Sequence, residues 1–469
     1  MASASPVTDA LDRATEIARA VDALGGRAFI VGGWVRDRLL GIASKDIDVE
    51  VYGVDAARLR SLLERLGPVN TVGESFTVYK LGALDVSLPR TDSKVGPGHR
   101  GFEVRGDPDL SIEEATRRRD FTVNAILWNP LTREYVDPFD GRGDLDRRVL
   151  RAVDVGTFGD DSLRVLRAVQ MAARFDLAID AGTAALCRAI RLDDLPSERL
   201  WGEFEKLLLR AARPSLGFEA ARDLGVDRQL LQEMVLLQEC PQEPEWHPEG
   251  DVWVHTLMVI DEARRRIDAL DHPKQVAIML GAVCHDFGKP ATTAFIEGRI
   301  RSRDHEEAGV APATVFLDRF NVHTLAGYDV RQQVLGLVAH HLKPGMWHTA
   351  PSGVGDGAFR RLAQKVDLEL LAVLASADCH GRTGRFDCSA MDWFLERARV
   401  LGVEHRPPAS LLKGRDLLAL GMTPGPDVGR ILKLIYEEQL DGRVTTADEA
   451  RDRARAMVAS KSDVGSASD

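Results

Sequence analysis

The sequence lacks the features of a secreted, membrane-spanning or disulfide-stabilised protein. Its five cysteines are scattered over 469 residues without a CxxC pair, which argues against a disulfide framework or a zinc ribbon and fits a reducing compartment. No apolar run approaches the roughly 18 residues that span a membrane. Met1 to Thr8 is small and polar, so we expect no signal peptide. These absences predict a cytoplasmic protein without membrane contact.

An excess of positive charge is also missing. The chain has 61 basic and 72 acidic side chains and a net charge of −11, which argues against a broad, non-specific nucleic-acid binder but allows a local basic groove. The apolar content of 44% and the charged content of 28% are those of an ordinary globular protein. The length suggests about three domains at roughly 150 residues each.

The first segment with chemical content is a diglycine turn between an apolar run and an amphipathic helix. Gly32 and Gly33 follow the apolar Phe29 to Val31, and Arg36 lies in the first expected helical turn. Glycine lets backbone N–H groups approach a phosphate, and a helix N-terminus favours negative charge. Arg36 adds a possible bidentate contact. The segment is therefore typical of a phosphate-binding turn.

Carboxylates follow this turn at the spacing of a β-strand. Asp46 and Asp48 are two residues apart in an alternating run, so their side chains are expected on one face. Asp85, in a later alternating stretch, is expected beside them, where it would activate the attacking hydroxyl or share a metal. Mg²⁺ is usually held by one or two carboxylates plus substrate phosphates. Any one of these features alone would indicate only a solvated surface, but together they predict a metal–triphosphate site.

A run of arginines, RRRDFTVNAI, leads into an apolar segment further along the chain. Arg119 suits a phosphate, while Asp120 and Asn124 suit ribose hydroxyl groups. Residues 90–108 are rich in glycine, proline and charge, and they predict a mobile loop. Residues 137–145 predict a turn cluster that acts as a hinge.

A helix expected over residues 160–176 opens with two acids, which suit a helix N-terminus. Asp161 and Arg164 are three residues apart and therefore adjacent on its surface. An ordinary ion pair is the simpler interpretation of this pair taken alone. The functional alternative is that both side chains hydrogen-bond the edge of a nucleobase.

A second group of reactive side chains follows residues 241–250, which we interpret as a linker. The group comprises His255, His285, Asp286, His305, His340, His341 and Asp378. Helical phase places Asp378 and His341 on apolar faces, where an ionisable group is costly unless it is paired or bound to metal. A single such histidine is usually a satisfied core residue, but this set predicts a metal site. Without thiolates it suits a catalytic Mn, Fe, Ni, Co or Mg ion rather than structural zinc.

The motifs GGWVRD, DID, RRRDFTVNAI, DPFDGRGDL, DDSLRVLRA and SERLWGEFEKLLL occur in this order. They resemble those of bacterial CCA-adding enzymes, the tRNA nucleotidyltransferases of the poly(A) polymerase-like class. The histidine group resembles an HD-type phosphohydrolase domain behind them. The resemblance implies an α+β fold with a polymerase-β-like nucleotidyltransferase head of mixed β-sheet and helices, then an all-α neck or body and an all-α HD domain. The expected ranges are 1–150 for the head, 151–240 for the neck, 246–400 for the HD domain and 401–469 for a helical tail with a disordered end from residue 460.

The resemblance also implies site residues, cofactors and partners. In the head, Asp46 and Asp48 would hold Mg²⁺ beside Asp85, and Asp161 and Arg164 would pair with the base of CTP or ATP while the tRNA 3′ end attacks. The remaining nucleotide contacts would come from Gly32, Gly33, Arg36, Arg119, Asp120, Asn124 and Arg167. In the HD domain the core ligands would be His255, His285, Asp286 and Asp378, with additional ligands His305, His340 and His341. This domain would use Ni²⁺, Mn²⁺, Fe²⁺ or Mg²⁺ to hydrolyse 2′,3′-cyclic phosphates, 2′-nucleotides or other phosphomonoesters.

Two departures from the family pattern leave alternatives open. The template motif begins with Asp160 instead of glutamate, and Gln170 stands where the family often has arginine. A CC-adding, A-adding or poly(A) variant is therefore an alternative to full CCA addition. A nucleotidyltransferase–HD regulator that modifies a protein and a head that only binds tRNA are alternatives from other classes. The sequence does not decide between a monomer and a homodimer, nor which residues contact tRNA.

Overall fold

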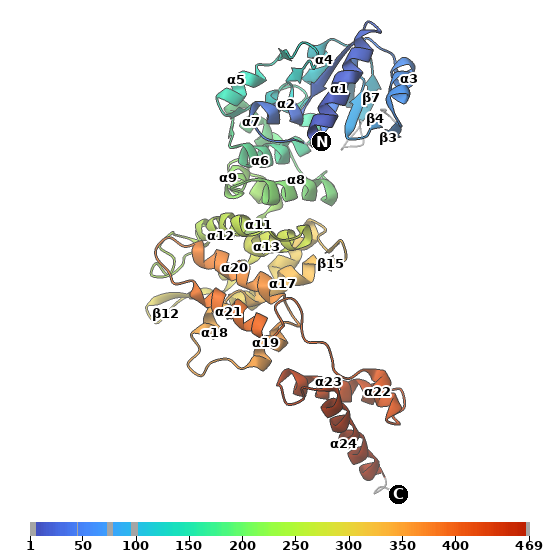
Figure 1. The fold of residues 1–469 in the computed structure, drawn as a ribbon. Helices are drawn as coiled ribbons and strands as arrows, with labels where there is room; N and C mark the ends of the chain where they lie inside the picture. The colour runs from blue at the N-terminus through green and yellow to red at the C-terminus, as the bar shows by residue number, and fades with distance from the viewer. Residues whose placement is uncertain (1–5, 45, 73–77, 95–101, 466–469) are drawn as a thin grey trace. The chain divides into compact units, whose positions relative to one another are not determined.

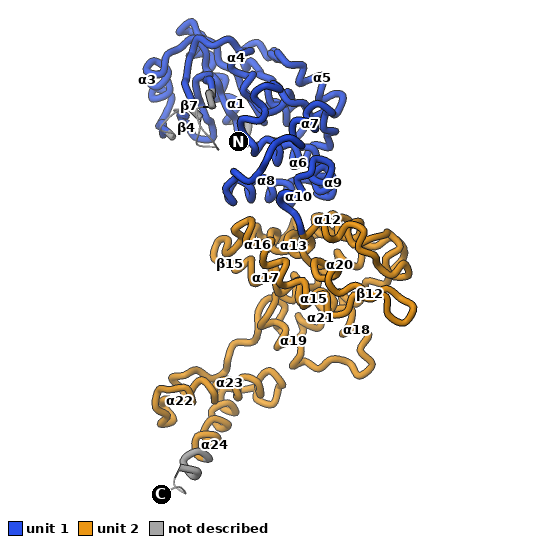
Figure 2. Tube along the Cα trace, turned by 180° about the vertical axis from the view of Figure 1, so that it is seen from behind, with its two compact units in different colours: residues 1–232 blue, residues 233–469 orange. Residues whose placement is uncertain are grey.

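The computed structural model describes residues 6–44, 46–72, 78–94 and 102–465 (Figure 1). The chain divides into two compact units, residues 1–232 and 233–469 (Figure 2). The first unit combines a mixed sheet with helices, and the second is largely helical, so the α+β class is confirmed. Among the described residues no helix combines the length and the apolar character needed to cross a membrane.

A seven-stranded sheet forms the centre of the first unit, with the strand order β3-β4-β5-β2-β1-β8-β9. All neighbouring strands are antiparallel except β2 and β5, which are parallel. The central strands β1 and β2 are almost entirely buried, in keeping with their β-branched and aromatic residues. The strands are β1 (Arg27–Val31), β2 (Ile47–Tyr52), β3 (Asn70–Val72), β4 (Val78–Leu81), β5 (Leu84–Ser87), β8 (Leu127–Trp128) and β9 (Tyr135–Val136).

Helices of the first unit cover the sheet and continue into a helical body. The helix α3 shows why they form: Asp55 caps it by accepting the N–H of Arg58 at 2.9 Å, and leucines at helical spacing form its buried face. In the body, α6 packs against α8 and α9. The helices are α1 (Pro6–Asp22), α2 (Gly33–Leu39), α3 (Ala56–Leu66), α4 (Ile112–Arg117), η1 (Thr122–Asn124), α5 (Gly141–Asp146), η2 (Phe158–Asp160), α6 (Leu163–Phe175), α7 (Ala181–Ala189), α8 (Ser197–Arg210), α9 (Ser215–Asp223) and α10 (Val226–Leu230). A short parallel pair, β10 (Val149–Leu150) and β11 (Ala178–Ile179), lies beside α6.

The stretch 90–108, which we expected to be a loop, contains an antiparallel hairpin. Strand β6 (Arg90–Lys94) pairs with β7 (Phe102–Gly106), and residues 95–101 lie outside the described residues. Strand β6 consists entirely of polar residues, so it lacks the apolar alternation that reveals a half-buried strand. The prediction of a loop was wrong for the two strands.

The expected hinge at residues 137–145 is a packed turn that continues into α5. Asp144 is 1% exposed and accepts a hydrogen bond from the Thr122 hydroxyl at 2.7 Å. A Cβ on Gly141 would lie 2.1 Å from the carbonyl oxygen of Thr122, so the close approach of α5 to η1 requires glycine. This packing argues against a freely moving hinge.

Four helices form the core of the second unit. In this core α12 packs against α13 and α20, and α17 packs against α13 and α20. The helices of the unit are α11 (Gln232–Val235), which begins at the boundary, then α12 (Val252–Arg266), α13 (His272–Cys284), α14 (Lys289–Thr292), α15 (His305–Ala308), α16 (Val310–Arg319), α17 (Val330–His340), α18 (Lys343–His348), α19 (Asp356–Leu362), α20 (Leu368–His380), α21 (Ser389–Val400), α22 (Gly414–Ala419), α23 (Pro426–Leu440) and α24 (Ala447–Gly465). Two small hairpins join them: β12 (Thr293–Ile296) with β13 (Arg299–Ser302), and β14 (Thr324–Leu325) with β15 (Tyr328–Asp329).

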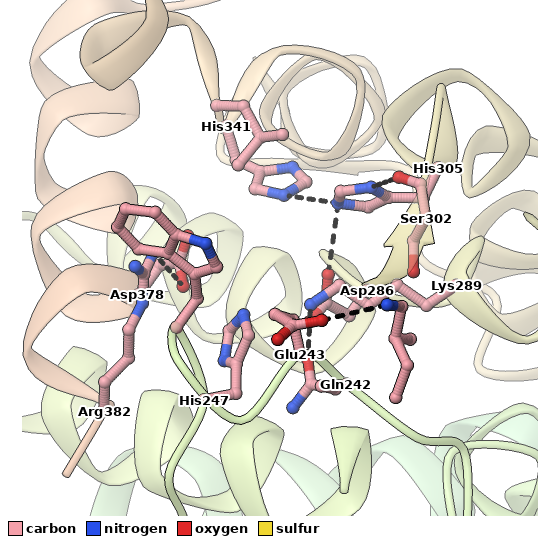
Figure 3. Close-up of a pocket in the computed structure, with 13 residues that line it drawn as sticks. Gln242, Glu243, His247, Asp286, Lys289, Ser302, His305, His341, Asp378 and Arg382 are labelled. Carbon is pink, nitrogen blue, oxygen red and sulfur yellow. Dashed lines mark hydrogen bonds and ion pairs between the residues drawn. The ribbon is translucent and has the colours of Figure 1, made fainter. Parts of the chain in front are cut away.

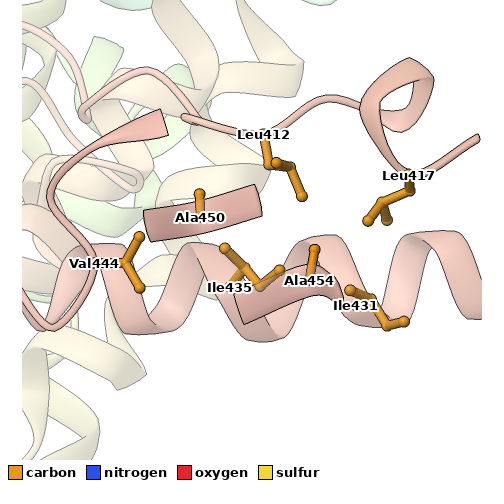
Figure 4. Packing of buried hydrophobic residues seen from close by; sticks show 7 residues of the cluster. All are labelled: Leu412, Leu417, Ile431, Ile435, Val444, Ala450 and Ala454. Atoms are coloured by element: carbon orange, nitrogen blue, oxygen red, sulfur yellow. The ribbon is translucent and has the colours of Figure 1, made fainter. Parts of the chain in front are cut away.

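The last three helices, α22 to α24, share a small apolar core of their own (Figure 4). Its buried members are Leu412, Leu417, Ile431, Ile435, Val444, Ala450 and Ala454. Helix α24 continues to Gly465, and the expected disorder at the end of the chain stays a prediction. Residues 466–469 lie outside the described residues.

One disulfide joins Cys379 at the end of α20 to Cys388 before α21, with a Cα–Cα distance of 6.0 Å, inside the range that a disulfide bridges. The other three cysteines are free and buried. The sequence predicted no disulfide framework, and it gave no sign of this single bridge because the two residues are nine positions apart and share no recognisable motif.

Candidate active sites

The three expected catalytic carboxylates lie at neighbouring positions of the sheet. Asp46 directly precedes β2, Asp48 is its second residue, and Asp85 on β5 is the register partner of Asp48. Register partners of parallel strands carry their side chains on the same face. Burial raises the pKa of Asp48; Arg119 opposes this rise, while the charges of Asp85 and Asp46 add to it. A divalent cation would relieve this repulsion, so the arrangement fits a metal site.

Gly32 leaves open space directly in front of Asp48. It has a φ of 73°, and a Cβ at this position would lie 3.6 Å from Asp48 Oδ2 and 3.3 Å from Arg119 Nη1. The positive φ at this position favours glycine. Arg119 is held in turn by Glu50, which is 1% exposed and accepts a hydrogen bond from Nη2 of Arg119 at 3.1 Å. The backbone turn, with Gly33 starting α2, therefore borders the carboxylates and one arginine, as a phosphate site requires.

Arg36, Asn124, Asp120 and Arg167 form one hydrogen-bonded chain that joins α2, η1 and α6. Arg36 Nη1 donates to Asn124 Oδ1 at 2.6 Å, Asn124 Nδ2 donates to Asp120 Oδ1 at 2.9 Å, and Arg167 Nε donates to Asp120 Oδ2 at 2.6 Å. Burial would raise the pKa of Asp120, but Arg167 and the bond from Asn124 lower it overall. The sequence predicted nucleotide contacts for these four residues. In the structure their side chains bond one another, and the nucleotide contacts stay a prediction.

Asp161 and Arg164 line a cavity of about 490 Å³. Its wall contains five arginines and three carboxylates, namely Arg90, Arg117, Arg118, Arg164, Arg199, Glu114, Asp160 and Asp161, together with Thr91, Val104 and Thr157. Arg164 donates to the carbonyl oxygens of Arg118 and Thr157 at 2.6 and 3.0 Å, and Asp161 pairs with Arg199 at 2.8 Å. The simple ion pair between Asp161 and Arg164 is therefore not how these side chains are held. The arginines give an acidic protein a locally basic cavity.

Gln170 lies in the interior of the body, on α6. It is 4% exposed, and its Oε1 atom has no hydrogen-bond partner among the described residues. Gln170, which stands where the family often has arginine, is thus a buried position.

Six of the seven predicted metal ligands meet in the second unit. They are His255 on α12, His285 and Asp286 after α13, His305 on α15, His341 after α17 and Asp378 on α20. His305 Nε2 lies 3.3 Å from His341 Nε2 and 3.3 Å from Asp286 Oδ1 (Figure 3). His255 Nε2 lies 3.0 Å from Asp378 Oδ1, and His285 Nε2 lies 3.2 Å from Asp286 Oδ2. The imidazole Nε2 atoms and the carboxylates therefore converge.

The tautomer of three of these histidines follows from the hydrogen bond that their Nδ1 atom makes. A carbonyl oxygen only accepts, so an Nδ1 atom bonded to one must carry the proton and leave the Nε2 lone pair free for a metal. The bonds run from His285 to Ala282 at 2.9 Å, from His305 to Ser302 at 2.8 Å and from His341 to Val338 at 2.8 Å. Burial and the neighbouring histidines lower the pKa of His341 to about 3. Buried imidazoles whose Nε2 atoms converge fit a divalent metal site.

His340 is not brought to this cluster. Successive residues of a helix point about 100° apart, and His340 lines a different cavity together with Lys343 and Lys365. Burial and Lys343 lower the pKa of His340 to about 4.

A cavity of about 260 Å³ opens onto the cluster, and residues that sequence reasoning missed line it (Figure 3). Lys289 donates to Gln242 at 2.6 Å and pairs with Asp286 at 2.8 Å, while Arg382 lies 3.7 Å from Asp378. Lys289 and Arg382 follow their carboxylates by three and four residues, a helical spacing that could have revealed them. The segment 241–250, predicted to be a linker, supplies Gln242, Glu243, Trp246 and His247 to the wall.

The chain is similar to known proteins along most of its length. The family "Poly A polymerase head domain" matches residues 28–151. The chain is 35% identical over 422 residues to a "Multifunctional CCA protein" of Xanthomonas campestris, covering 87% of this chain and 96% of the relative. It is 36% identical over 371 residues to one of Thioalkalivibrio sulfidiphilus, covering 76% and 86%. The chain belongs to the multifunctional CCA protein family.

Solved structures of CCA-adding enzymes share its fold. The Bacillus stearothermophilus enzyme in complex with CTP matches with a TM-score of 0.64 and 20% identity, covering 97% of this chain and 100% of that one. The Thermotoga maritima enzyme complexed with tRNA matches with a TM-score of 0.55 and 20% identity, covering 96% of each chain. The expected nucleotidyltransferase head followed by a helical body is therefore confirmed for this member of the multifunctional CCA protein family.

Two residues of the first unit in this member of the multifunctional CCA protein family were not predicted, Glu50 in the sheet and Arg199 in the helical body. Glu50 holds Arg119 from within the DIDVE run, two residues after Asp48 on the same strand, and period two could have placed it there. Arg199, on α8, reaches Asp161 from 38 residues away. No local spacing links these two residues, so only the packing of α8 beside α6 reveals the contact.

Proposed function

We propose that this protein adds CMP and AMP from CTP and ATP to the 3′ end of tRNA to build the CCA terminus. The observation that carries the proposal is the basic cavity lined by Asp161 and Arg164 in a member of the multifunctional CCA protein family. The related enzymes solved with CTP, ATP and tRNA support these partners.

The head residues suit in-line nucleotidyl transfer. The tRNA 3′-oxygen would form a bond to the α-phosphorus of the nucleotide as the bond to pyrophosphate breaks. Asp46, Asp48 and Asp85 would hold Mg²⁺, which when bound stabilises charge on the attacking and leaving oxygens. Gly32 leaves room for the triphosphate, and Arg119, fixed by Glu50, adds positive charge. The protein contributes position and charge and forms no covalent intermediate.

Base selection follows from hydrogen-bond chemistry. Cytosine and adenine both present an amino group beside an unprotonated ring nitrogen, whereas uracil and guanine present a carbonyl beside a ring N–H. The Asp161 carboxylate only accepts and the Arg164 guanidinium only donates, so together they match cytosine and adenine and oppose the other two bases. This complementarity supports selection of C and A by one pair of side chains.

Stepwise incorporation on a tRNA that ends before the CCA sequence tests this function. We expect two additions from CTP and one from ATP, and we expect Asp161→Ala to lose discrimination against UTP and GTP. Use of CTP alone would identify the CC-adding variant, and use of ATP alone would identify the A-adding variant. Repeated addition from ATP would identify the poly(A) variant. Transfer of UMP to a protein instead of RNA would support the regulator alternative, and no incorporation at all would support the tRNA-binding alternative.

We propose as a second function a metal-dependent phosphohydrolase of the HD type, with 2′,3′-cyclic phosphodiesterase, 2′-nucleotidase or phosphatase activity. The convergence of the imidazole Nε2 atoms with Asp286 and Asp378 favours it. A bound Ni²⁺, Mn²⁺, Fe²⁺ or Mg²⁺ ion would supply an activated water. Lys289 and Arg382 at the cavity wall suit the phosphate of the substrate.

Phosphate release from 2′,3′-cyclic and 2′-nucleotides, measured after chelation and again with each metal added back, tests this second function. Activity that survives chelation would contradict it. We expect both activities in the cytoplasm, and a monomer or a homodimer is compatible with each of them.

A further inference from the structure

Glu249 contacts two histidines from the segment that the sequence presented as a linker. Its Oε1 atom lies 2.9 Å from Nδ1 of His247 and 2.9 Å from Nδ1 of His255. The first contact is aligned as a hydrogen bond, and the second is a close but less aligned ion pair. The Glu249 side chain is 1% exposed, so this carboxylate is buried against the outer side of the His255 ring.

In the other three histidines of the cluster, Nδ1 has a backbone carbonyl oxygen as its hydrogen-bond acceptor. His285, His305 and His341 each bond Nδ1 to the carbonyl oxygen three residues earlier. His285 and His341 directly follow α13 and α17, where the last carbonyls have no intrahelical partner. His305 is the first residue of α15, so its carbonyl partner precedes the helix.

His255 is placed differently, because it lies inside the first turn of α12 (Val252–Arg266). The carbonyl three residues before it belongs to Val252, and in an α-helix this oxygen accepts the N–H of Thr256. No free backbone carbonyl is available to Nδ1 of His255 in the way it is for the other three. The carboxylate of Glu249 occupies that place.

Glu249 is itself fixed from another element. Its Oε2 atom accepts the backbone N–H of Thr383 at 3.3 Å. Thr383 follows α20, which carries Asp378, and is next to Arg382 of the cavity wall. One side chain thus joins α12, the segment before it and the chain after α20.

We propose that Glu249 is a positioning residue for metal binding, which directs Nε2 of His255 toward Asp286 and Asp378 by holding Nδ1 of the same ring. Outer carboxylates of this kind orient a ligating histidine and raise its basicity. The inference rests on the proposed metal-dependent function of the second unit. It also gives residues 241–250 a role in the site.

Co²⁺ titration of the full-length, chelator-stripped protein tests this, with the visible absorption of the bound ion as the readout. We expect Glu249→Ala to weaken Co²⁺ binding by about 10- to 100-fold, the usual effect of losing such an outer partner, and to alter the absorption band. Glu249→Gln keeps the volume and one acceptor oxygen, so its affinity should lie between those of wild type and Glu249→Ala. Glu245→Ala is the matched control, since Glu245 is in the same segment but 55% exposed and paired with Arg299.

The outcomes separate the inference from the function on which it rests. Glu249→Ala and Glu249→Gln proteins that bind Co²⁺ as tightly as wild type, with an unchanged spectrum, would overturn the positioning role alone. Wild-type protein that binds Co²⁺ but hydrolyses no phosphoester would contradict the proposed hydrolysis and leave the positioning role standing. Wild-type protein that binds no Co²⁺ would overturn both.

Discussion

The guanidinium of Arg199 holds the carboxylate of Asp161, with 2.8 Å between Nη2 and Oδ2. The other carboxylate oxygen of Asp161 accepts the N–H of Leu163 at 3.2 Å. Arg164 is fixed separately by the carbonyls of Thr157 and Arg118. The two side chains proposed to read the base are therefore positioned by their surroundings. The Asp161 carboxylate and the Arg164 guanidinium do not have to pair with each other to be held in place.

Replacing Arg199 with alanine tests this arrangement. A charge-assisted hydrogen bond of this kind contributes about 1.5–3 kcal/mol, so we expect kcat/KM for CTP and ATP to fall by about 10- to 100-fold. Misincorporation of UTP should rise, because Asp161 is no longer held. Single-nucleotide kinetics on tRNA measure both effects. Arg191→Ala, at an exposed position, is the control, and unchanged base selectivity in Arg199→Ala would contradict the positioning role.

The pH dependence of nucleotide addition should reflect Asp48. Burial raises its pKa, and the Arg119 guanidinium opposes the rise. Only the ionised carboxylate holds Mg²⁺, so activity falls as pH drops through this raised pKa. Replacing Arg119 with glutamine removes the opposing charge and should move the acidic limb of the kcat/KM profile to higher pH. A limb that stays in place or moves to lower pH would show that Arg119 does not act on Asp48.

The adjacent residues His340 and His341 provide a matched pair for the second site. His341 belongs to the convergent cluster, whereas His340 lines another cavity. We expect His341→Ala to lower metal-dependent hydrolysis by at least about 100-fold, since a direct ligand contributes more than an outer partner. His340→Ala should keep the activity, and both variants should still add nucleotides. Phosphate release and CTP incorporation measure these outcomes, and equal losses of hydrolysis in the two variants would contradict the assignment.

Without metal, the stability of the second unit should pass through a maximum near pH 6.5. The pKa of His341 is lowered from 6.5 to about 3, so between these values the unfolded chain binds a proton that the folded chain does not, and stability is lost as pH falls. Burial opposes protonation of His255 and His305, yet contacts with Asp378 and Asp286 raise their pKa values. Their contribution is present below pH 6.5 and is lost as pH rises through the raised values.

Hydrogen exchange of the peptides from α12, α13, α17 and α20 in chelated protein, corrected for the intrinsic exchange rate, measures this stability. His341→Asn should flatten the acidic side of the profile. Protection that increases from pH 6.5 toward pH 5 would contradict the prediction.

Spacing within one element was readable from the sequence, whereas contacts between elements were not. Period two placed Asp46 and Asp48 on one face, and helical phase identified His341 and Asp378 as buried polar positions. The same phase separates His340 from His341 by about 100°, yet counting histidines grouped them together. Arg199 reaches Asp161, and Glu249 reaches Thr383, only because distant segments pack together, and no local pattern marks such a contact. The polar strand β6 was missed because its residues show no apolar alternation.

We propose that one chain carries a nucleotide-adding head and a separate hydrolytic site. The most direct measurement follows stepwise CTP and ATP addition to a tRNA that lacks CCA, alongside phosphate release from a 2′,3′-cyclic nucleotide, for wild type, Asp48→Ala and His285→Ala. We predict that wild type adds nucleotides and hydrolyses, that Asp48→Ala hydrolyses without adding, and that His285→Ala adds without hydrolysing. A wild-type protein that adds no nucleotide, or a His285→Ala protein in which both activities fall together, would contradict the presence of two separate sites.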